Sequence, residues 1–155
     1  MTRVRIRPAT PADAPAMAAL LAPHIRAGGR TAIPEPPSPA TLSAWWLTGP
    51  RALFCQLAED GGGLLGLQSV SRHPQLPTGW GDVATFVREG RARRGTGRRL
   101  FAAMRGLVAA RALPGLVAVV GAENGPALAY YGAMGFRLWR RLGDGRLALR
   151  RRLGP

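Results

Sequence analysis

The stretch Val87-Arg-Glu-Gly-Arg-Ala-Arg-Arg-Gly-Thr-Gly-Arg-Arg-Leu-Phe101 decides the fold. An apolar strand pattern runs into a glycine-punctuated, arginine-rich loop, and an amphipathic helix pattern begins directly after it. The first turn of a helix leaves about four backbone N–H groups without partners, and the helix dipole adds positive potential there. Because Gly95 and Gly97 carry no side chains, we expect a diphosphate to reach these donors. Taken alone, this spacing also fits a solvated helix entry.

Apolar periodicity and turn residues predict the elements on either side of this stretch. Thr10 and Ser38 are expected helix caps, each followed by a proline at the first helical position. The predicted order is β-α-α-β-β-β-α-β-α-β-β, which indicates an α/β (α+β) fold with a mixed sheet and helices on both faces. The expected strands span residues 4–7, 51–58, 64–71, 81–88, 116–120, 136–142 and 146–150, and the last two helices span 97–112 and 126–134.

Length and composition fit one domain over residues 1–155, because 46% of the residues are hydrophobic. The longest apolar stretches fall short of the ~20 residues that a membrane span needs. No signal-peptide pattern is present, and a single cysteine, Cys55, suits a reducing compartment. We therefore expect a cytoplasmic protein without membrane contact, with Cys55 as a buried strand thiol.

The net charge of +14 raises the question of nucleic-acid binding. All 22 basic residues are arginines, and most are dispersed along the chain. No recognition-helix pattern or interleaving of aromatic and basic residues accompanies them. We expect non-specific attraction of polyanions and no specific nucleic-acid partner.

The loop resembles motif A of the Gcn5-related N-acetyltransferases (GNAT superfamily), which reads (Arg/Gln)-x-x-Gly-x-(Gly/Ala). Here the motif is Ala92-Arg-Arg-Gly95-Thr-Gly97, so Ala92 replaces the usual Arg or Gln. The resemblance implies that acetyl-CoA is the cosubstrate, and the departure at Ala92 leads us to expect weakened or rearranged binding.

A second block, from Asn124 to Phe136, resembles the family signature Asn-x-x-Ala-(Ile/Leu)-x-x-Tyr-x-x-x-Gly-Phe. The resemblance implies that Asn124 contacts the pantetheine arm and that Tyr131 protonates the leaving thiolate. A half-buried structural tyrosine is the alternative for Tyr131, and Tyr130 points about 100° away around the helix.

The resemblance covers essentially the whole chain. It implies a mixed, mostly antiparallel sheet of six to seven strands with about four helices. It also implies a bulge in the strand at 81–88 that frees an N–H near Phe86 and Val87 for the thioester carbonyl. The expected cofactor-binding residues are Phe86, Val87, Arg93, Arg94, Gly95, Thr96, Gly97, Arg98, Asn124 and Ala127.

Asp82 is the first candidate for the base, because it falls on the glutamate of a Glu-x-Ser-x-(Tyr/Phe)-Val pattern in the phosphinothricin-type branch. A strand-end carboxylate paired with an arginine is the alternative, and Glu89 and Glu123 are weaker candidates. That branch also implies that residues 30–38 form a wall of the acceptor pocket. A generic surface loop is the alternative for this segment.

Four residues are therefore expected to meet the acceptor, which we predict to be a small primary amine of the amino-acid type: Ile33, Glu35, Arg72 and His73. The open alternatives are acetylation of a protein N-terminus or lysine, and a non-catalytic coenzyme A-binding domain of the same fold. No metal site is expected, and Trp45 and Trp46 favour a homodimer.

Overall fold

The computed structural model describes residues 3–27, 33–90 and 94–153. Its centre is a seven-stranded sheet in the order β1-β2-β3-β4-β5-β7-β6, in which β4 and β5 are parallel and every other neighbouring pair is antiparallel. The strands are β1 (Arg5–Pro8), β2 (Ala52–Asp60), β3 (Gly63–Ser71), β4 (Gly81–Val87), β5 (Gly115–Gly121), β6 (Arg137–Arg141) and β7 (Arg146–Arg152).

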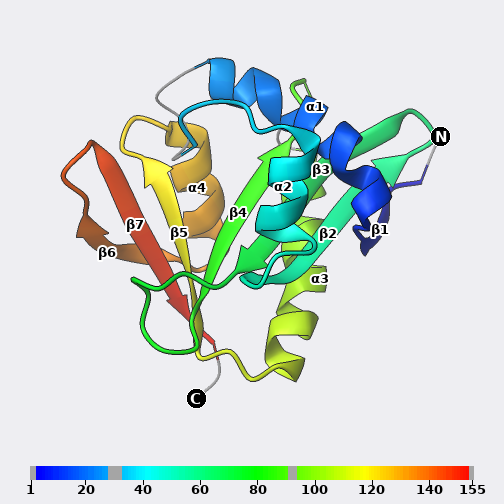
Figure 1. Cartoon of the computed structure of the whole chain (residues 1–155). Helices are drawn as coiled ribbons and strands as arrows, with labels where there is room; N and C mark the ends of the chain where they lie inside the picture. Colours follow the sequence, from blue (N-terminus) through cyan, green and yellow to red (C-terminus); the bar gives the residue numbers. More distant parts are fainter. Residues whose placement is uncertain (1–2, 28–32, 91–93, 154–155) are drawn as a thin grey trace.

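Helices cover both faces of the sheet, and Figure 1 shows α2 in front of it and α3 behind it. On one face, α1 and α2 pack on Leu57, Leu67 and Phe86. On the other face, Phe101 and Met104 of α3 share a core with Val70 and Val83. The helices are α1 (Ala14–Arg26), α2 (Pro39–Trp46), α3 (Thr96–Ala110) and α4 (Gly125–Ala133), and a 3₁₀ turn (Pro11–Asp13) precedes α1.

The helices begin where the capping residues predict. The backbone N–H of Thr10 donates to Asp13 Oδ2 at 2.8 Å, which fixes the turn before α1. The Ser38 hydroxyl accepts from the N–H of Thr41 at 3.1 Å at the start of α2. The helix α1 ends at Arg26.

The predicted element order and the mixed, mostly antiparallel sheet are confirmed. The main differences are at element ends. The strand β7 continues to Arg152, because Arg151 and Arg152 pair with Leu116 and Gly115 of β5. None of the helices among the described residues has the length and hydropathy that crossing a membrane requires.

The pairing of β4 with β5 is short, and this positions the site. Only Gly81–Leu116 and Asp82–Val117 are paired, although β4 continues to Val87 and β5 continues to Gly121. Since β5 pairs with β7 along its whole length, the two central strands diverge beyond Asp82. The divergence opens a gap in the middle of the sheet, at the carboxyl ends of two parallel strands.

Candidate active site

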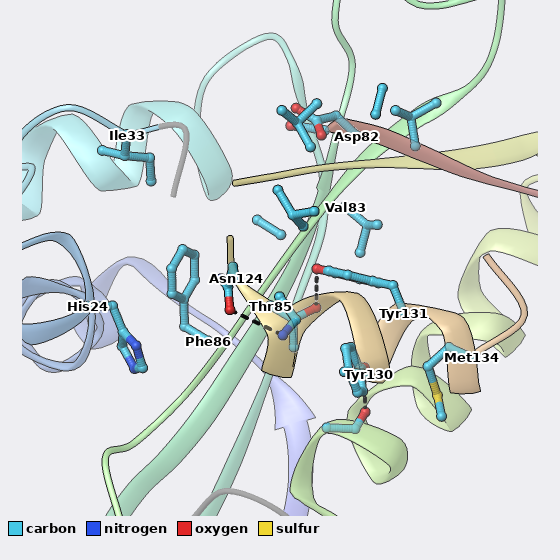
Figure 2. Close-up of a pocket in the computed structure, with 18 of the residues that line it drawn as sticks. His24, Ile33, Asp82, Val83, Thr85, Phe86, Asn124, Tyr130, Tyr131 and Met134 are labelled. Carbon is cyan, nitrogen blue, oxygen red and sulfur yellow. Dashed lines mark hydrogen bonds between the residues drawn. The ribbon is translucent and has the colours of Figure 1, made fainter. Parts of the chain in front are cut away.

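A cavity of about 1330 Å³ extends along the gap between β4 and β5. It reaches the first turn of α3 and the start of α4 at one end, and α2 and the segment after β3 at the other. Figure 2 shows Asp82 and Thr85 on β4 and the two tyrosines on α4 around it. The gap therefore connects the expected cofactor-binding residues with the residues expected to meet the acceptor.

The backbone of β4 offers hydrogen-bonding groups to this gap. Arg88 N–H donates to Leu65 O at 2.7 Å, and the pairing of β3 with β4 continues from there in register. Because alternate residues of an antiparallel strand face the same neighbour, the N–H and C=O groups of Thr85 and Val87 turn away from β3 toward the gap. The Val87 carbonyl accepts from His24 Nε2 at 2.7 Å.

This arrangement corrects the bulge expected at Phe86 and Val87. Throughout the described pairing of β3 with β4 there is no register shift, so neither residue lies in a bulge. The free donors arise because β5 diverges from β4 instead. By the same alternation, the N–H of Phe86 faces β3, and the donor available to the gap at this position is that of Val87.

The first turn of α3 lies at the end of the cavity that also reaches the start of α4. Gly95 precedes this turn. Gly95 has φ +84°, a left-handed conformation that glycine adopts without strain, and an added Cβ would have no neighbour within 4 Å. Arg99 N–H donates to Gly95 O at 3.0 Å and closes the first turn. The N–H groups before Arg99 therefore have no partner within the helix, and Arg98 adds a cation at the cavity wall.

Gly97 is a glycine for a different reason. A Cβ at this position would lie 2.7 Å from Cε1 of Tyr130, whose ring packs against the helix start. The Tyr130 hydroxyl donates to Gly97 O at 2.8 Å. Gly97 thus allows α4 to approach α3, a role that the sequence does not indicate because the partner lies 33 residues away.

Tyr131 is buried, with 4% of its surface exposed, and is still one of the residues that line the cavity. That hydroxyl donates to Thr85 Oγ1 at 2.9 Å (Figure 2). Burial raises the pKa of Tyr131 above its usual value, so the phenol keeps its proton at neutral pH. Tyr131 can therefore act as a proton donor inside the gap.

Asp82 lies on the opposite face of β4 from Thr85, because side chains alternate along a strand. Its neighbours on that face are Ala84 and Phe86, as the period of two predicts. Burial raises the pKa of the Asp82 carboxyl to about 6. Among the described residues no arginine forms a salt bridge with Asp82, the pairing that the alternative interpretation expects.

Asn124 caps α4, since its Oδ1 accepts from Ala127 N–H at 3.2 Å. Both residues line the cavity, as do Phe86 and Val87. Of the expected loop residues, Gly95 to Arg98 line it, Arg94 is exposed outside it, and Arg93 lies outside the described residues.

Of the residues expected to meet the acceptor, three line the cavity and one does not. Ile33, Arg72 and His73 line the cavity, whereas Glu35 is exposed and is not part of its wall. Trp46 is buried and stacks on Phe86, so it is a core residue. Trp45 is 38% exposed at the cavity edge.

Several cavity residues were missed by the sequence reasoning. Arg140 lies 4.3 Å from the ring centroid of Trp139, and both residues line the cavity beyond β5. Buried Gln68 and half-buried Thr85 form hydrogen bonds with the two tyrosines. The described residues contain no group of three or more His, Cys, Asp or Glu side chains that could hold a metal ion.

Comparison with known proteins identifies the family and the fold. The model of the acetyltransferase (GNAT) family matches residues 21–136. Among solved structures, a GCN5-related N-acetyltransferase from Kribbella flavida is 21% identical with a TM-score of 0.81, over 97% of this chain and 98% of that one. An N-acetyltransferase from Staphylococcus aureus Mu50 is 18% identical with a TM-score of 0.84, over 98% and 99%.

A GNAT superfamily phosphinothricin acetyltransferase from Sinorhizobium meliloti, solved in complex with AcCoA, is 19% identical with a TM-score of 0.78, over 97% of this chain and 89% of that one. A search of curated proteins found no match. At these identities the solved structures establish the fold, and the family model establishes the membership. The chain belongs to the acetyltransferase (GNAT) family.

Proposed function

We propose that the protein transfers the acetyl group of acetyl-CoA to the primary amine of a small acceptor of the amino-acid type, with Tyr131 as the acid and Asp82 as the base. The observation that carries the proposal is the position of these two groups. They approach the gap between β4 and β5 from opposite faces of the sheet, and both line one cavity. A thioester held in the gap has a proton donor on one side and a carboxylate on the other.

The reaction is a direct transfer. The amine lone pair attacks the thioester carbonyl carbon, and the N–H groups of β4 that face the gap stabilise the oxyanion. The C–S bond then breaks, and the sulfur takes the proton of the Tyr131 hydroxyl. Because an alkyl ammonium has a pKa near 10, Asp82 accepts the amine proton through water and holds the amine in place.

The first turn of α3 suits the diphosphate of the cosubstrate. Its N–H groups and the Arg98 guanidinium supply donors and positive charge. Asn124 and Ala127 border the path from this turn to the gap, where we assign them to the pantetheine arm. The Ala92 departure lies outside the described residues, and its expected effect on affinity stays a prediction.

The acceptor end of the cavity favours an amine that also carries an acidic group. Arg72 and His73 line the cavity in the segment after β3, and Arg140 of β6 lines it as well; none of the three forms a salt bridge among the described residues. Basic side chains without salt bridges suit an acceptor that carries a negative group, such as a zwitterion, better than a polyamine. The expected homodimer depends on Trp45 alone, since Trp46 is a core residue; the dimer and the cytoplasmic location stay predictions.

The test is a panel of acceptors with acetyl-CoA, in which turnover is measured as the release of the free thiol of coenzyme A. Amino acids, acidic amino-acid analogues, polyamines and peptides with free N-termini form the panel. The proposal expects turnover with an acidic or zwitterionic amine and a loss of kcat of about 10²-fold or more in Tyr131→Phe. Turnover confined to peptides would favour a protein acceptor, and unchanged kcat in Tyr131→Phe would remove the acid role.

A further inference from the structure

A chain of hydrogen bonds connects the proposed acid to the loop at the start of α3. The Tyr131 hydroxyl donates to Thr85 Oγ1 at 2.9 Å, and Gln68 Nε2 donates to the same Thr85 oxygen at 2.9 Å. The other hydrogen of Gln68 Nε2 goes to the Tyr130 hydroxyl at 3.1 Å, which in turn donates to Gly97 O. These groups come from β3, β4, α4 and the first turn of α3.

The chain lies in a part of the sheet where water has little access. Gln68 is fully buried, and its Oε1 has no hydrogen-bond partner among the described residues. A buried amide with an orphaned oxygen destabilises a strand by about 1–3 kcal/mol relative to a well-paired or apolar side chain. Packing therefore does not explain a glutamine at this position, and its two donated bonds do.

The arrangement leaves the proton of the Thr85 hydroxyl available for one more hydrogen bond. A hydroxyl has two acceptor lone pairs and one proton. Tyr131 and Gln68 fill both lone pairs, so the Thr85 proton remains for another acceptor at the cavity wall. Thr85 is also the sole hydrogen-bond partner of the Tyr131 hydroxyl among the described residues.

From this geometry we infer that Thr85 and Gln68 are positioning residues for the acid: Gln68 holds Thr85, and Thr85 orients the Tyr131 hydroxyl and then stabilises its phenolate. The inference rests on the proposed role of Tyr131. When Tyr131 gives its proton to the sulfur, the phenolate oxygen becomes an acceptor, and the Thr85 hydroxyl reverses to donate its own proton in a hydrogen bond. Tyr131 regains a proton from water when the products leave.

The Thr85 hydroxyl matters because, among the described residues, it is the side-chain donor at the phenolate oxygen, beside the backbone N–H of Thr85, which Thr85→Val would leave in place. Burial raises the Tyr131 pKa, and an acid whose pKa is too high transfers its proton slowly. A hydrogen bond to a charged group stabilises it by about 1.5–3 kcal/mol. Loss of that bond is expected to lower kcat by about tenfold to 100-fold, with little change in the KM for acetyl-CoA.

The test uses the full chain with Thr85→Val, Thr85→Ser and Gln68→Met. We expect Thr85→Val to lower kcat by about tenfold or more and Thr85→Ser to restore most of it. Gln68→Met should lower kcat while the melting temperature stays the same or rises, because the orphaned oxygen is removed. A merely structural glutamine would show the reverse: a lower melting temperature and unchanged kcat.

Ser69→Ala is the matched control. Ser69 follows Gln68 on β3, is equally buried and also lacks a hydrogen-bond partner among the described residues, but it faces the other side of the sheet. We expect kcat to stay at the wild-type value in this variant. A fall in kcat as large as that of Gln68→Met would mean that any polar deletion in β3 disturbs the site, and would overturn the inference.

A double-mutant cycle separates this inference from the proposed function. If Thr85 acts through Tyr131, Thr85→Val has no further effect on kcat in a Tyr131→Phe background. Equal losses in both backgrounds, or unchanged kcat in Thr85→Val alone, overturn the role of Thr85 and leave the acid role of Tyr131 intact. Unchanged kcat in Tyr131→Phe alone overturns the acid role itself.

Discussion

The hydroxyl of Tyr130 donates a hydrogen bond to the carbonyl oxygen of Gly97 at 2.8 Å, and its ring occupies the space where a side chain at Gly97 would begin. The two residues hold α4 against the start of α3. The start of α3, to which we assign the diphosphate, and α4, which carries the proposed acid, are thereby joined at one point. A change at Gly97 should therefore affect the fold and the cosubstrate site together.

Gly97→Ala is expected to destabilise the protein. The new Cβ would meet the Tyr130 ring at 2.7 Å, and overpacking of this kind costs about 1–3 kcal/mol. In a chain of this size each kcal/mol shifts the melting temperature by about 2–4 °C. Gly106→Ala is the control within α3, because an added Cβ has no neighbour within 4 Å there. This control should melt higher, by up to about 1 kcal/mol of stability. If the two variants melt alike, the contact between Gly97 and Tyr130 does not constrain the helices.

Tyr130→Phe should separate binding from chemistry. The variant loses the bond to Gly97 O and the bond accepted from Gln68, so the start of α3 loses one restraint. It keeps the ring and the bond from Gln68 to Thr85 that positions the acid. We expect a KM for acetyl-CoA that rises by several-fold and a kcat that stays close to that of wild type, the opposite of the split expected for Tyr131→Phe. Steady-state kinetics at a saturating acceptor concentration measure both constants. A large loss of kcat in Tyr130→Phe would move the acid role to this neighbour.

Asp82 predicts an acidic limb in the pH profile. Burial raises its pKa to about 6, so the carboxylate that serves as the base is lost as the pH falls through about 6. We expect kcat/KM to decline below this pH in wild type and the limb to disappear in Asp82→Asn, together with most of the activity. A limb that survives in Asp82→Asn would assign the titration to another group.

The stability of Asp82→Asn should change in the opposite sense to its activity. The folded pKa lies above the unfolded value of 3.8, so the folded state binds more protons between about pH 4 and pH 6. Stability that this group contributes is therefore lost as the pH rises through that window. At pH 7 the variant should be more stable than wild type, by up to about 3 kcal/mol. If the difference in stability between Asp82→Asn and wild type is the same at pH 7 as at pH 4, the carboxyl is well solvated.

Cys55 is expected to be inert in the native enzyme. It is the single cysteine, it is buried in β2, and burial raises its thiol pKa to about 12. Alkylating reagents should leave the native thiol and the activity unchanged, and should react once the protein is unfolded. Rapid inactivation by such a reagent would instead favour a covalent acyl-enzyme on Cys55.

The sequence was sufficient to predict the element order, because hydrophobic periodicity and glycine or proline residues mark each strand and helix. It also located the helix start at Gly95 and Gly97 and the signature from Asn124 to Phe136. These are local patterns, and the structure brings most of their residues to one cavity.

The polar contacts within the site could not be predicted in the same way. The pair of Gln68 and Thr85 depends on the register of β3 with β4, and the role of Gly97 depends on where α4 docks. A bulge was expected near Phe86, whereas the free donors of β4 arise from the divergence of β5, a property of two strands that are far apart in the sequence. Periodicity carries no information about such pairings.

Calorimetric titration of coenzyme A, with the wild-type chain, Gly95→Ala and Gly106→Ala, tests most directly the claim that the start of α3 binds the diphosphate. A non-glycine residue at φ +84° is strained by about 1–2 kcal/mol, so we predict affinity about tenfold weaker in Gly95→Ala, unchanged affinity in Gly106→Ala, and no difference between variants for pantetheine, which lacks the diphosphate. Equal affinity for coenzyme A in wild type and Gly95→Ala, or no binding by the folded wild-type protein, would contradict the account.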